Sequence, residues 1–116
     1  MTPKTRLQKQ ADKLWFEAYL QPKCEICDNK ATQLHHYYYK SSFGHLRYDK
    51  DNGISLCQQH HFQLHHQDPK KVEYLIVKKR GSQWLEKLQQ KAYNPSANFK
   101  TTIGYYKKVI NQLTNK

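Results

Sequence analysis

The sequence predicts a single small α+β domain, in which a metal-stapled core of two strands and one helix lies between helical flanks. All three cysteines and all seven histidines of the 116 residues fall between positions 24 and 66. This density of metal ligands is typical of a small metal-dependent core. Turn residues separate two strand-like runs in this segment, whereas apolar side chains before and after it repeat at helical spacing. One domain is therefore expected over 1–116, with an N-terminal helix in 1–22, the core in 24–67 and further helices in 68–116.

The first helix is predicted over residues 3–21. Pro3 suits a first helical turn, and Gln21 ends the helix because it precedes Pro22 and so disfavours helical geometry. Apolar side chains recur at spacings of four, three and four residues, the period of one helix face. This stripe comprises Leu7, Ala11, Leu14 and Ala18, and it is widened by Trp15 and Tyr19.

Two pairs of potential zinc ligands frame the core. Cys24 and Cys27 form a Cys-x-x-Cys pair, and Cys57 and His60 form a Cys-x-x-His pair after a further 29 residues. Each pair can bind one ion from a tight turn, and together they complete the tetrahedral Cys3His set that structural zinc prefers. Three cysteines cannot all pair as disulfides within one chain. The spacing therefore predicts a structural zinc ion on these four residues.

Between the two pairs the sequence favours a β-hairpin with a long connection. The strand-like runs are 34–39, which is rich in tyrosine and histidine, and 54–56. Serine and glycine mark a loop at 41–44, and residues 49–53 form a turn. The consecutive tyrosines 37–39 could stack on bases, although packing in the core or on the sheet is the commoner use of such rings.

A helix predicted over 58–67 positions three more histidines. His61 and His65 are four residues apart, so both imidazoles leave the same face one turn apart. His60 points about 100° away from His61. Neighbouring histidines can therefore serve different ions, with His60 on the zinc and the other two on a second metal.

The strand that contains His35 and His36 completes this second site. His35 is placed to supply a third ligand. Because strand side chains alternate between faces, His36 points elsewhere and is free to act as a base.

Three helices are predicted after the core. The first, over about 69–79, has Asp68 as its N-cap. Ser82 is expected to cap the second, residues 94–96 to break it, and threonine 101 or 102 to start the third. The side chains expected to pack are Val72, Leu75 and Ile76 in the first helix, Trp84, Leu85, Leu88 and Ala92 in the second, and Ile103, Tyr106, Ile110 and Leu113 in the third.

The charge balance indicates a polyanionic partner. Lys and Arg number 20 against 9 acidic residues, for a formal net charge of +11. Such an excess favours nucleic acid, whose phosphates release counterions when they are neutralised, although it also serves simply to keep a small protein in solution. In the hairpin connection, Lys40 and Arg47 are candidate phosphate contacts, and Arg47 is favoured because its planar fork matches phosphate.

The sequence also predicts the compartment. No apolar run approaches the roughly 20 residues that a bilayer crossing needs, and the N-terminus lacks an apolar signal core. We therefore expect a cytoplasmic protein with reduced thiols and no membrane contact.

The motif segments resemble the HNH endonucleases, the ββα-metal or His-Me finger nucleases, in their zinc-knuckle form. The resemblance is carried by Leu34-His35-His36, then Asp51-Asn52-Gly53-Ile54, then Cys57-x-x-His60-His61-x-x-x-His65. Further residues are similar to phage HNH nucleases, including recombination nucleases of the NinG type: Leu46-Arg47-Tyr48-Asp49, Tyr74-Leu75-Ile76 and Arg80-Gly81. The resemblance implies a setting in a bacterial or phage-infected cell.

The resemblance implies a metal-dependent endonuclease that hydrolyses DNA phosphodiester bonds to a 5′-phosphate and a 3′-hydroxyl. His36 would be the general base that activates water, and Asn52 would hold the loop and orient that base. The catalytic ion would lie on His35, His61 and His65 and would stabilise the transition state and the leaving 3′ oxygen. All-histidine ligation favours Zn²⁺, Ni²⁺, Co²⁺ or Mn²⁺, while Mg²⁺ can act when substrate oxygens complete its shell.

Two ligand assignments stay open at this point. The second knuckle of the family usually ends in cysteine, so the roles of His60 and His61 could be exchanged. His66 is an alternative to His65 as the third ligand of the catalytic ion.

Two other functions are consistent with parts of the sequence. A zinc-stabilised nucleic-acid-binding module without activity explains the zinc ligands and the charge equally well, but it has no need to place His35, His36 and Asn52 together with the helix histidines. A redox protein built on the Cys-x-x-Cys pair lacks the surrounding βαβ pattern. The sequence therefore favours the endonuclease over the binding module.

Overall fold

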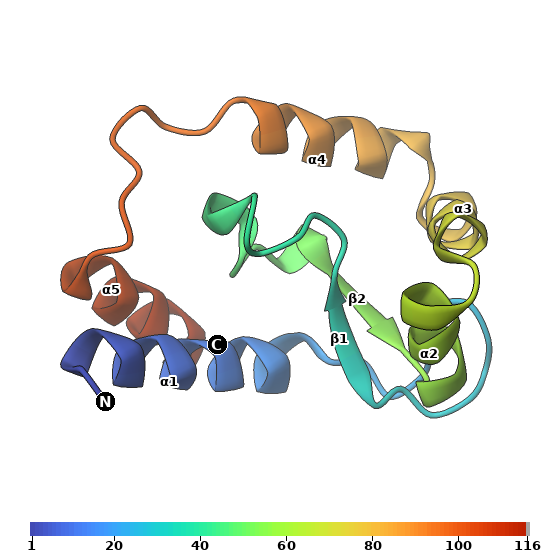
Figure 1. The fold of residues 1–116 in the computed structure, drawn as a ribbon, viewed down its shortest axis with the longest axis horizontal. Coiled ribbons are helices and arrows are strands. Elements are labelled where there is room, and N and C mark those ends of the chain that lie inside the picture. The colour runs from blue at the N-terminus through green and yellow to red at the C-terminus, as the bar shows by residue number, and fades with distance from the viewer. Residues whose placement is uncertain (116) are drawn as a thin grey trace.

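The computed structural model describes residues 1–115, and its architecture is α+β (Figure 1). In this part of the chain, five α-helices surround a two-stranded sheet, which confirms the predicted α+β class and the helical flanks. The elements in chain order are α1 (Pro3–Tyr19), β1 (Gln33–His36), the short 3-10 helices η1 (Gly44–Leu46) and η2 (Lys50–Asn52), β2 (Gly53–Leu56), α2 (Gln58–His66), α3 (Pro69–Arg80), α4 (Ser82–Tyr93) and α5 (Ile103–Thr114).

The sheet pairs β1 with β2 in antiparallel register. His35 lies opposite Ile54 and His36 opposite Gly53, and all four residues of β2 are buried. Gly53 is required by a close approach, since a Cβ there would stand 3.0 Å from a ring carbon of Trp15 and 3.2 Å from a methyl of Leu34. The missing side chain lets α1 pack directly beneath the strand pair.

The first strand is shorter than the predicted run 34–39, and it ends at His36. The backbone N–H of Tyr37 still donates to the Asn52 carbonyl (2.9 Å), but the N–H of Tyr38 donates to the Asn52 side-chain oxygen (2.8 Å). Because a side chain replaces the partner strand at this point, the ladder cannot continue.

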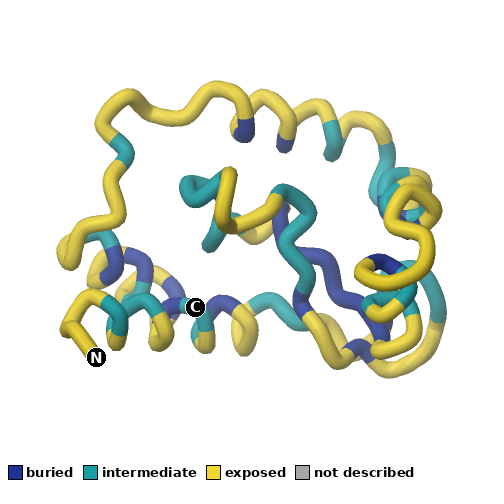
Figure 2. The backbone as a smooth tube through the Cα atoms, in the orientation of Figure 1, coloured by how far each residue is buried: buried dark blue, intermediate teal, exposed yellow. Residues whose placement is uncertain are grey.

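The core consists of three neighbouring clusters, and the buried positions line the inner faces of the tube in Figure 2. The first joins the sheet to α2 and α3, the second joins α1 to α5, and the third lies under α4. Their buried residues are Cys24, Ile54, Leu56, Cys57, Leu64, Val72 and Ile76 in the first; Ala11, Trp15, Leu34, Tyr106, Val109 and Leu113 in the second; and Leu46, Leu88 and Ala92 in the third.

Helices α1 and α5 lie side by side and begin with threonine caps (Figure 1). The hydroxyls of Thr2 and Thr102 accept backbone N–H groups in the first turn of each helix, as predicted for the second of them. Ala18 is exposed, contrary to the predicted stripe, because α1 packs on α5 through Ala11 and Trp15 and the apolar face continues toward Tyr19 instead.

Helices α3 and α4 differ from the prediction at two positions. The Asp68 cap is confirmed, since its carboxylate accepts the N–H of Lys71 at 3.1 Å. Ser82 is the first residue of α4 and not its cap, because Gly81 (φ 96°) occupies the junction in the left-handed region that glycine tolerates. Leu75 is only half-buried, whereas Val72 and Ile76 are fully buried.

No helix within residues 1–115 combines the length and the apolar character needed to cross a membrane.

Candidate metal centres

Cys24, Cys27, Cys57 and His60 converge on one point, with their ligand atoms within 4.8 Å of one another. The Cys27 and Cys57 sulfurs are 3.7 Å apart, and His60 Nδ1 lies 3.6 Å from the Cys24 sulfur and 3.3 Å from the Cys57 sulfur. Tetrahedral zinc with Zn–S bonds of about 2.3 Å and Zn–N bonds of about 2.0 Å separates its ligand atoms by roughly 3.5–3.8 Å. The four residues therefore fit one zinc ion.

Hydrogen bonds of the local backbone position these ligands. The N–H of Cys24 donates to the Asn29 carbonyl (2.8 Å) and closes a tight turn around the first pair. Cys57 is the N-cap of α2, where its sulfur accepts the N–H of His60 at 3.4 Å. Burial raises the pKa of the Cys24 thiol, but backbone N–H groups, that of Cys57 first, outweigh burial and lower the pKa overall. The turn thus favours the thiolate at Cys24, whereas burial and the neighbouring sulfurs raise the pKa of the Cys27 thiol to about 11.

A second cluster brings His35 of β1 together with His61 and His65 of α2. Their ligand nitrogens also lie within 4.8 Å of one another, a span that one divalent ion with metal–nitrogen bonds of about 2.1 Å bridges after small ring rotations. Burial, reinforced by the neighbouring histidines, lowers the pKa of His35 to about 3, and burial lowers that of His61 as well. Both imidazoles are therefore neutral near pH 7, as metal ligands must be.

His36 lies beside this cluster in the same hollow and packs against α1. Its ring stacks on Trp15 with centroids 4.2 Å apart and planes 12° from parallel. Its Nε2 lies 2.9 Å from the backbone carbonyl of Arg47. Because a carbonyl only accepts, Nε2 must carry the proton and Nδ1 is left as the basic nitrogen. Burial lowers the pKa of His36 and so keeps the ring neutral.

Asn52 holds the loop that positions His36. The side chain is fully buried; its amide nitrogen donates to the carbonyls of Tyr38 (3.1 Å) and Leu46 (3.2 Å), while its oxygen accepts from Tyr38. Leu46 directly precedes Arg47, whose carbonyl meets His36. The Asn52 side-chain amide thereby fixes both ends of the segment that follows His36, and so it orients the His36 ring.

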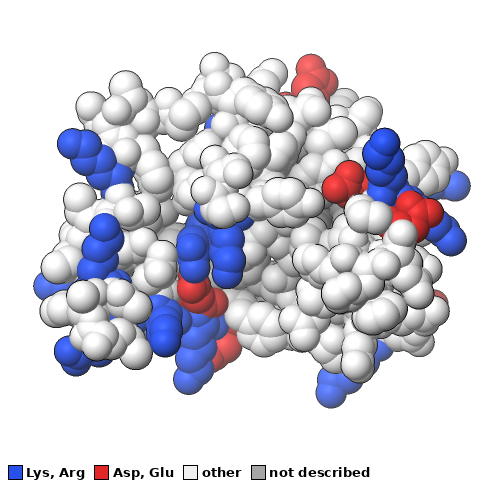
Figure 3. Space-filling view, in the orientation of Figure 1, with Lys and Arg blue, Asp and Glu red and all other residues white. Residues whose placement is uncertain are grey.

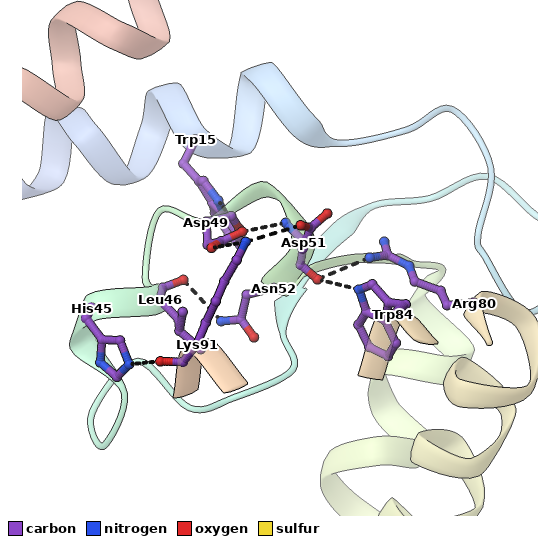
Figure 4. A network of polar contacts seen from close by, with 9 residues as sticks. All are labelled: Trp15, His45, Leu46, Asp49, Asp51, Asn52, Arg80, Trp84 and Lys91. Atoms are coloured by element: carbon purple, nitrogen blue, oxygen red, sulfur yellow. Dashed lines mark hydrogen bonds and ion pairs between the residues drawn. The ribbon is translucent and has the colours of Figure 1, made fainter. Parts of the chain in front are cut away.

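Side chains from α3 and α4 fix the turn that presents Asn52 (Figure 4). Lys91 pairs with Asp49 (3.2 Å) and Asp51 (3.4 Å). Burial alone would lower the pKa of Lys91, but the hydrogen bonds and negative charges of the two carboxylates outweigh burial and raise it. The Asp51 carbonyl accepts hydrogen bonds from Trp84 (2.9 Å) and Arg80 (3.2 Å). The C-terminal helices thus support the site without contributing a metal ligand.

The two predicted phosphate contacts differ in their surroundings. Arg47 forms a bidentate pair with Asp12 of α1 at 2.9 and 2.7 Å, and its side chain is 18% exposed. Tyr48 donates its hydroxyl to the same carboxylate at 2.9 Å. The Arg47 guanidinium therefore has its ion pair inside the protein, whereas Lys40 is exposed and lines the hollow beside His36.

Two surface hollows meet at His61 and His65. The first, which also contains His36, has a volume of about 370 Å³, and the second, which also contains Phe62, has a volume of about 550 Å³. The histidine cluster is thus accessible from two sides, which leaves room for a substrate that passes across it. The first hollow is further lined by Leu34, His35, His36, Tyr39, Lys40 and Ser41, and the second by Thr32, Gln33, Gln58, Phe62 and His66.

The geometry also separates the ligand alternatives. His60 belongs to the cysteine cluster and His61 to the histidine cluster, so the two are not exchanged. His65 joins the histidine cluster, whereas His66 packs on the ring of Phe62 with centroids 4.8 Å apart.

Sequence reasoning missed Asp12 and the contact of Trp15 with His36. Asp12 was not singled out, and Trp15 was expected only as part of the apolar stripe. The two are three residues apart and therefore share one face of α1. A carboxylate next to a buried tryptophan was the available signal, because an acidic side chain on an apolar face needs a partner.

Basic side chains occupy both ends of the face in Figure 3, over the α1 and α5 side and again near α3. Acidic atoms on this face are fewer, and several lie beside basic ones. This distribution agrees with the excess of 20 basic over 9 acidic residues.

Comparisons of the chain with family models, with curated proteins and with solved structures found no match. Any functional conclusion therefore depends on the geometry of the two clusters. Chemically, that geometry combines a cysteine-histidine group that could bind zinc with a half-open group of three histidines that could hold a second divalent ion, and it places a neutral, oriented histidine in the hollow beside the second group.

Proposed function

We propose that this chain is a metal-dependent endonuclease of the HNH type, which hydrolyses phosphodiester bonds in DNA. One observation carries the proposal: His36, with Nδ1 left as its basic nitrogen, lines the same hollow as the three-histidine cluster. A pure binding module has no need for an oriented base next to an accessible metal site. The chain order β1, β2, α2, with ligands from the first strand and the helix, agrees with a ββα-metal core.

In the proposed reaction, His36 accepts a proton from water as the water oxygen attacks phosphorus. The bond from phosphorus to the 3′ oxygen breaks, and the leaving 3′ oxygen takes up a proton from solvent water, so the products are a 5′-phosphate and a 3′-hydroxyl. The Arg47 carbonyl, which accepts from His36 Nε2, stabilises the imidazolium that forms. Asn52 acts as a positioning residue, because it holds the loop that carries this carbonyl.

The remaining residues bind and orient the substrate. His35, His61 and His65 would hold the divalent ion, which supplies charge stabilisation at a non-bridging phosphate oxygen and at the leaving 3′ oxygen. Lys40 lines the same hollow and can contact a phosphate of the bound strand. Three neutral imidazoles suit Zn²⁺, Ni²⁺, Co²⁺ or Mn²⁺, and substrate oxygens would complete the shell of Mg²⁺.

The second part of the proposal is a resident zinc ion on Cys24, Cys27, Cys57 and His60. The sulfur and nitrogen separations within this cluster support it. In this role zinc joins the turn before β1 to the start of α2, and so fixes the helix that presents His61 and His65.

A plasmid-nicking assay tests the proposal, with Mg²⁺, Mn²⁺, Ni²⁺, Co²⁺ and Zn²⁺ supplied in turn. His36→Ala should lower the cleavage rate by about 100- to 10,000-fold while divalent-ion and DNA affinity stay close to those of the wild type. The reason is that a general base acts in the transition state and adds little to ground-state binding.

His61→Ala provides the contrast, since it should weaken divalent-ion binding and cleavage together. Zinc content and the unfolding midpoint of both variants serve as controls for the fold. A wild type that never cuts faster than His36→Ala with any of the five ions contradicts the proposal, and DNA binding without cutting would then favour the zinc-stabilised binding module.

A further inference from the structure

Of the three consecutive tyrosines, Tyr39 is placed differently from the other two. Tyr37 packs on Trp84 with ring centroids 5.1 Å apart, and Tyr38 packs on Phe43 at 4.8 Å. Tyr39 is 60% exposed and lines the hollow that contains His36 and the metal-ligand histidines. Core packing therefore explains Tyr37 and Tyr38 but leaves the ring of Tyr39 without a structural use.

A second exposed ring lies in the other hollow. Phe62 of α2 is 52% exposed, and its ring is supported on one side by His66. This hollow shares His61 and His65 with the first. An exposed aromatic side chain is therefore present in each of the two hollows that meet at the candidate catalytic ion.

The polar groups around the two rings suit a nucleic-acid strand. Lys40 follows Tyr39 in the chain and supplies a positive charge for the backbone. Amide and hydroxyl side chains of Thr32, Gln33 and Gln58 surround Phe62 and can bond to sugar and base edges. A basic contact next to aromatic platforms is the arrangement by which proteins hold single strands.

Aromatic stacking distinguishes between kinds of substrate. In an intact duplex both faces of each base are covered by its neighbours, so only an unpaired base can present a face to a protein ring. We infer that the two hollows together bind an unpaired DNA strand, with bases on the two sides of the scissile phosphate stacked on Tyr39 and Phe62. This inference rests on the endonuclease function proposed above.

A binding experiment tests this inference without depending on cleavage. The full-length His36→Ala protein is titrated, at one fixed salt concentration, with a short fluorescein-labelled DNA strand and with the same strand in a blunt duplex. The single strand should bind more tightly than the duplex. Adding Tyr39→Ala or Phe62→Ala should weaken single-strand binding roughly 5- to 100-fold, the range that stacking of one base accounts for, and should leave duplex binding nearly unchanged.

Two further variants separate stacking from general damage. Tyr39→Trp keeps a stacking surface and should restore single-strand affinity. Tyr74→Ala removes another exposed tyrosine, which is 63% exposed on α3 and lines neither hollow, and should change nothing. Equal affinity for both DNA forms, or equal weakening of both by Tyr39→Ala, overturns the inference.

Cleavage assays on chains that retain His36 distinguish a failure of this inference from a failure of the proposed function. Tyr39→Ala should raise KM for a single-stranded substrate with little change in kcat, because stacking acts in ground-state binding. If the wild type cuts duplex and single strand equally and Tyr39→Ala affects neither, the stacking inference fails while the endonuclease stands. If the wild type cuts neither form yet binds the single strand through Tyr39 and Phe62, the endonuclease fails and the strand site stands.

Discussion

At the scale of single residues, the neighbours His35 and His36 show how one strand can serve two chemical tasks. Alternation of faces turns His35 toward His61 and His65 on α2 and turns His36 toward Trp15 on α1. Burial lowers the pKa of both rings. In the proposed reaction, the same physical cause would keep one ring available as a ligand and the other as a base, because each task requires neutral imidazole.

This burial makes the stability of the ion-free histidine site depend on pH. The pKa of His35 falls from 6.5 to about 3 on folding, so the unfolded chain binds more protons between these values. The stability that the neutral ring contributes is complete above pH 6.5 and is lost as the pH falls toward 3. Urea unfolding without added catalytic ion should therefore show a larger loss of stability from pH 7 to pH 5 in the wild type than in His35→Gln.

The comparison is internally controlled, because both proteins keep the cysteine cluster and its own pH dependence. An identical loss of unfolding free energy in the two proteins between pH 7 and pH 5 would show that His35 is not held neutral by the fold.

The grouping of single residues was predictable where spacing defined it, and not where a distant partner did. The four residues of the cysteine cluster and the three histidines of the second cluster come together as their spacing predicted. Arg47 was expected to face phosphate, but its guanidinium is paired with Asp12, 35 positions earlier in the chain. Nothing local in the sequence specifies that partner, because the contact exists only once α1 packs beside the loop.

At the scale of elements, α2 joins the two candidate metal clusters. Its N-cap Cys57 and His60 in its first turn belong to the cysteine cluster, while His61 and His65 belong to the histidine cluster. A helix of nine residues is too short to be stable alone. The orientation of His61 and His65 should therefore depend on what anchors the first turn.

Cys57→Ser tests that dependence on zinc. Serine is itself a good N-cap, so the substitution keeps the cap of α2 while it removes a zinc ligand. Purified wild-type protein should contain one tightly held zinc ion per chain, and the variant should lose both the ion and much of its thermal stability, since binding free energy of structural zinc is folding free energy. Metal analysis and circular dichroism melts measure the two effects.

His61→Ala is the matched control, because it alters the other cluster on the same helix and should retain the tightly held zinc. Full thermal stability in a zinc-free preparation of the wild type would show that the cysteine cluster is not a structural metal site.

Helices were predictable from local signals, whereas within the segment 37–52 only the loop at 41–44 and the turn at 49–53 were. Period, proline and capping residues placed α1, α3, α4 and α5 close to their observed bounds. The two 3-10 helices and the early end of β1 depend on Asn52, whose side chain bonds to Tyr38 and Leu46 across the loop. Such contacts form only in the folded chain, so no periodic pattern in the sequence predicts them.

At the scale of the whole molecule, the helices outside the core act as supports for a small site. The pair α1 and α5 buries Trp15, on which His36 stacks, while α4 covers Leu46 and supplies Lys91 to the turn before Asn52. The basic excess lies on the surface of this assembly (Figure 3). Charge is therefore a property of the whole surface, and its effect on binding is best measured on the intact, inactive protein.

DNA binding by the His36→Ala protein should weaken linearly when log affinity is plotted against log salt. Each phosphate contact contributes about −0.9 to the slope on duplex DNA and about −0.7 on a single strand. With 20 basic and 9 acidic residues, the chain has enough excess charge for several such contacts. Anisotropy titrations between low and physiological salt measure the slope, and base identity should matter little to it.

Lys40 and Arg47 allow the slope to be assigned to particular side chains. Lys40 is exposed and lines the hollow beside His36, so adding Lys40→Ala should reduce the magnitude of the slope by about one. Arg47 is already paired with Asp12 and only 18% exposed at its side chain, so Arg47→Gln should leave the slope nearly unchanged even if it lowers stability. A flat salt dependence would exclude the basic surface as the DNA contact. A slope that responds to Arg47→Gln and not to Lys40→Ala would mean that Arg47 leaves Asp12 for phosphate when DNA binds.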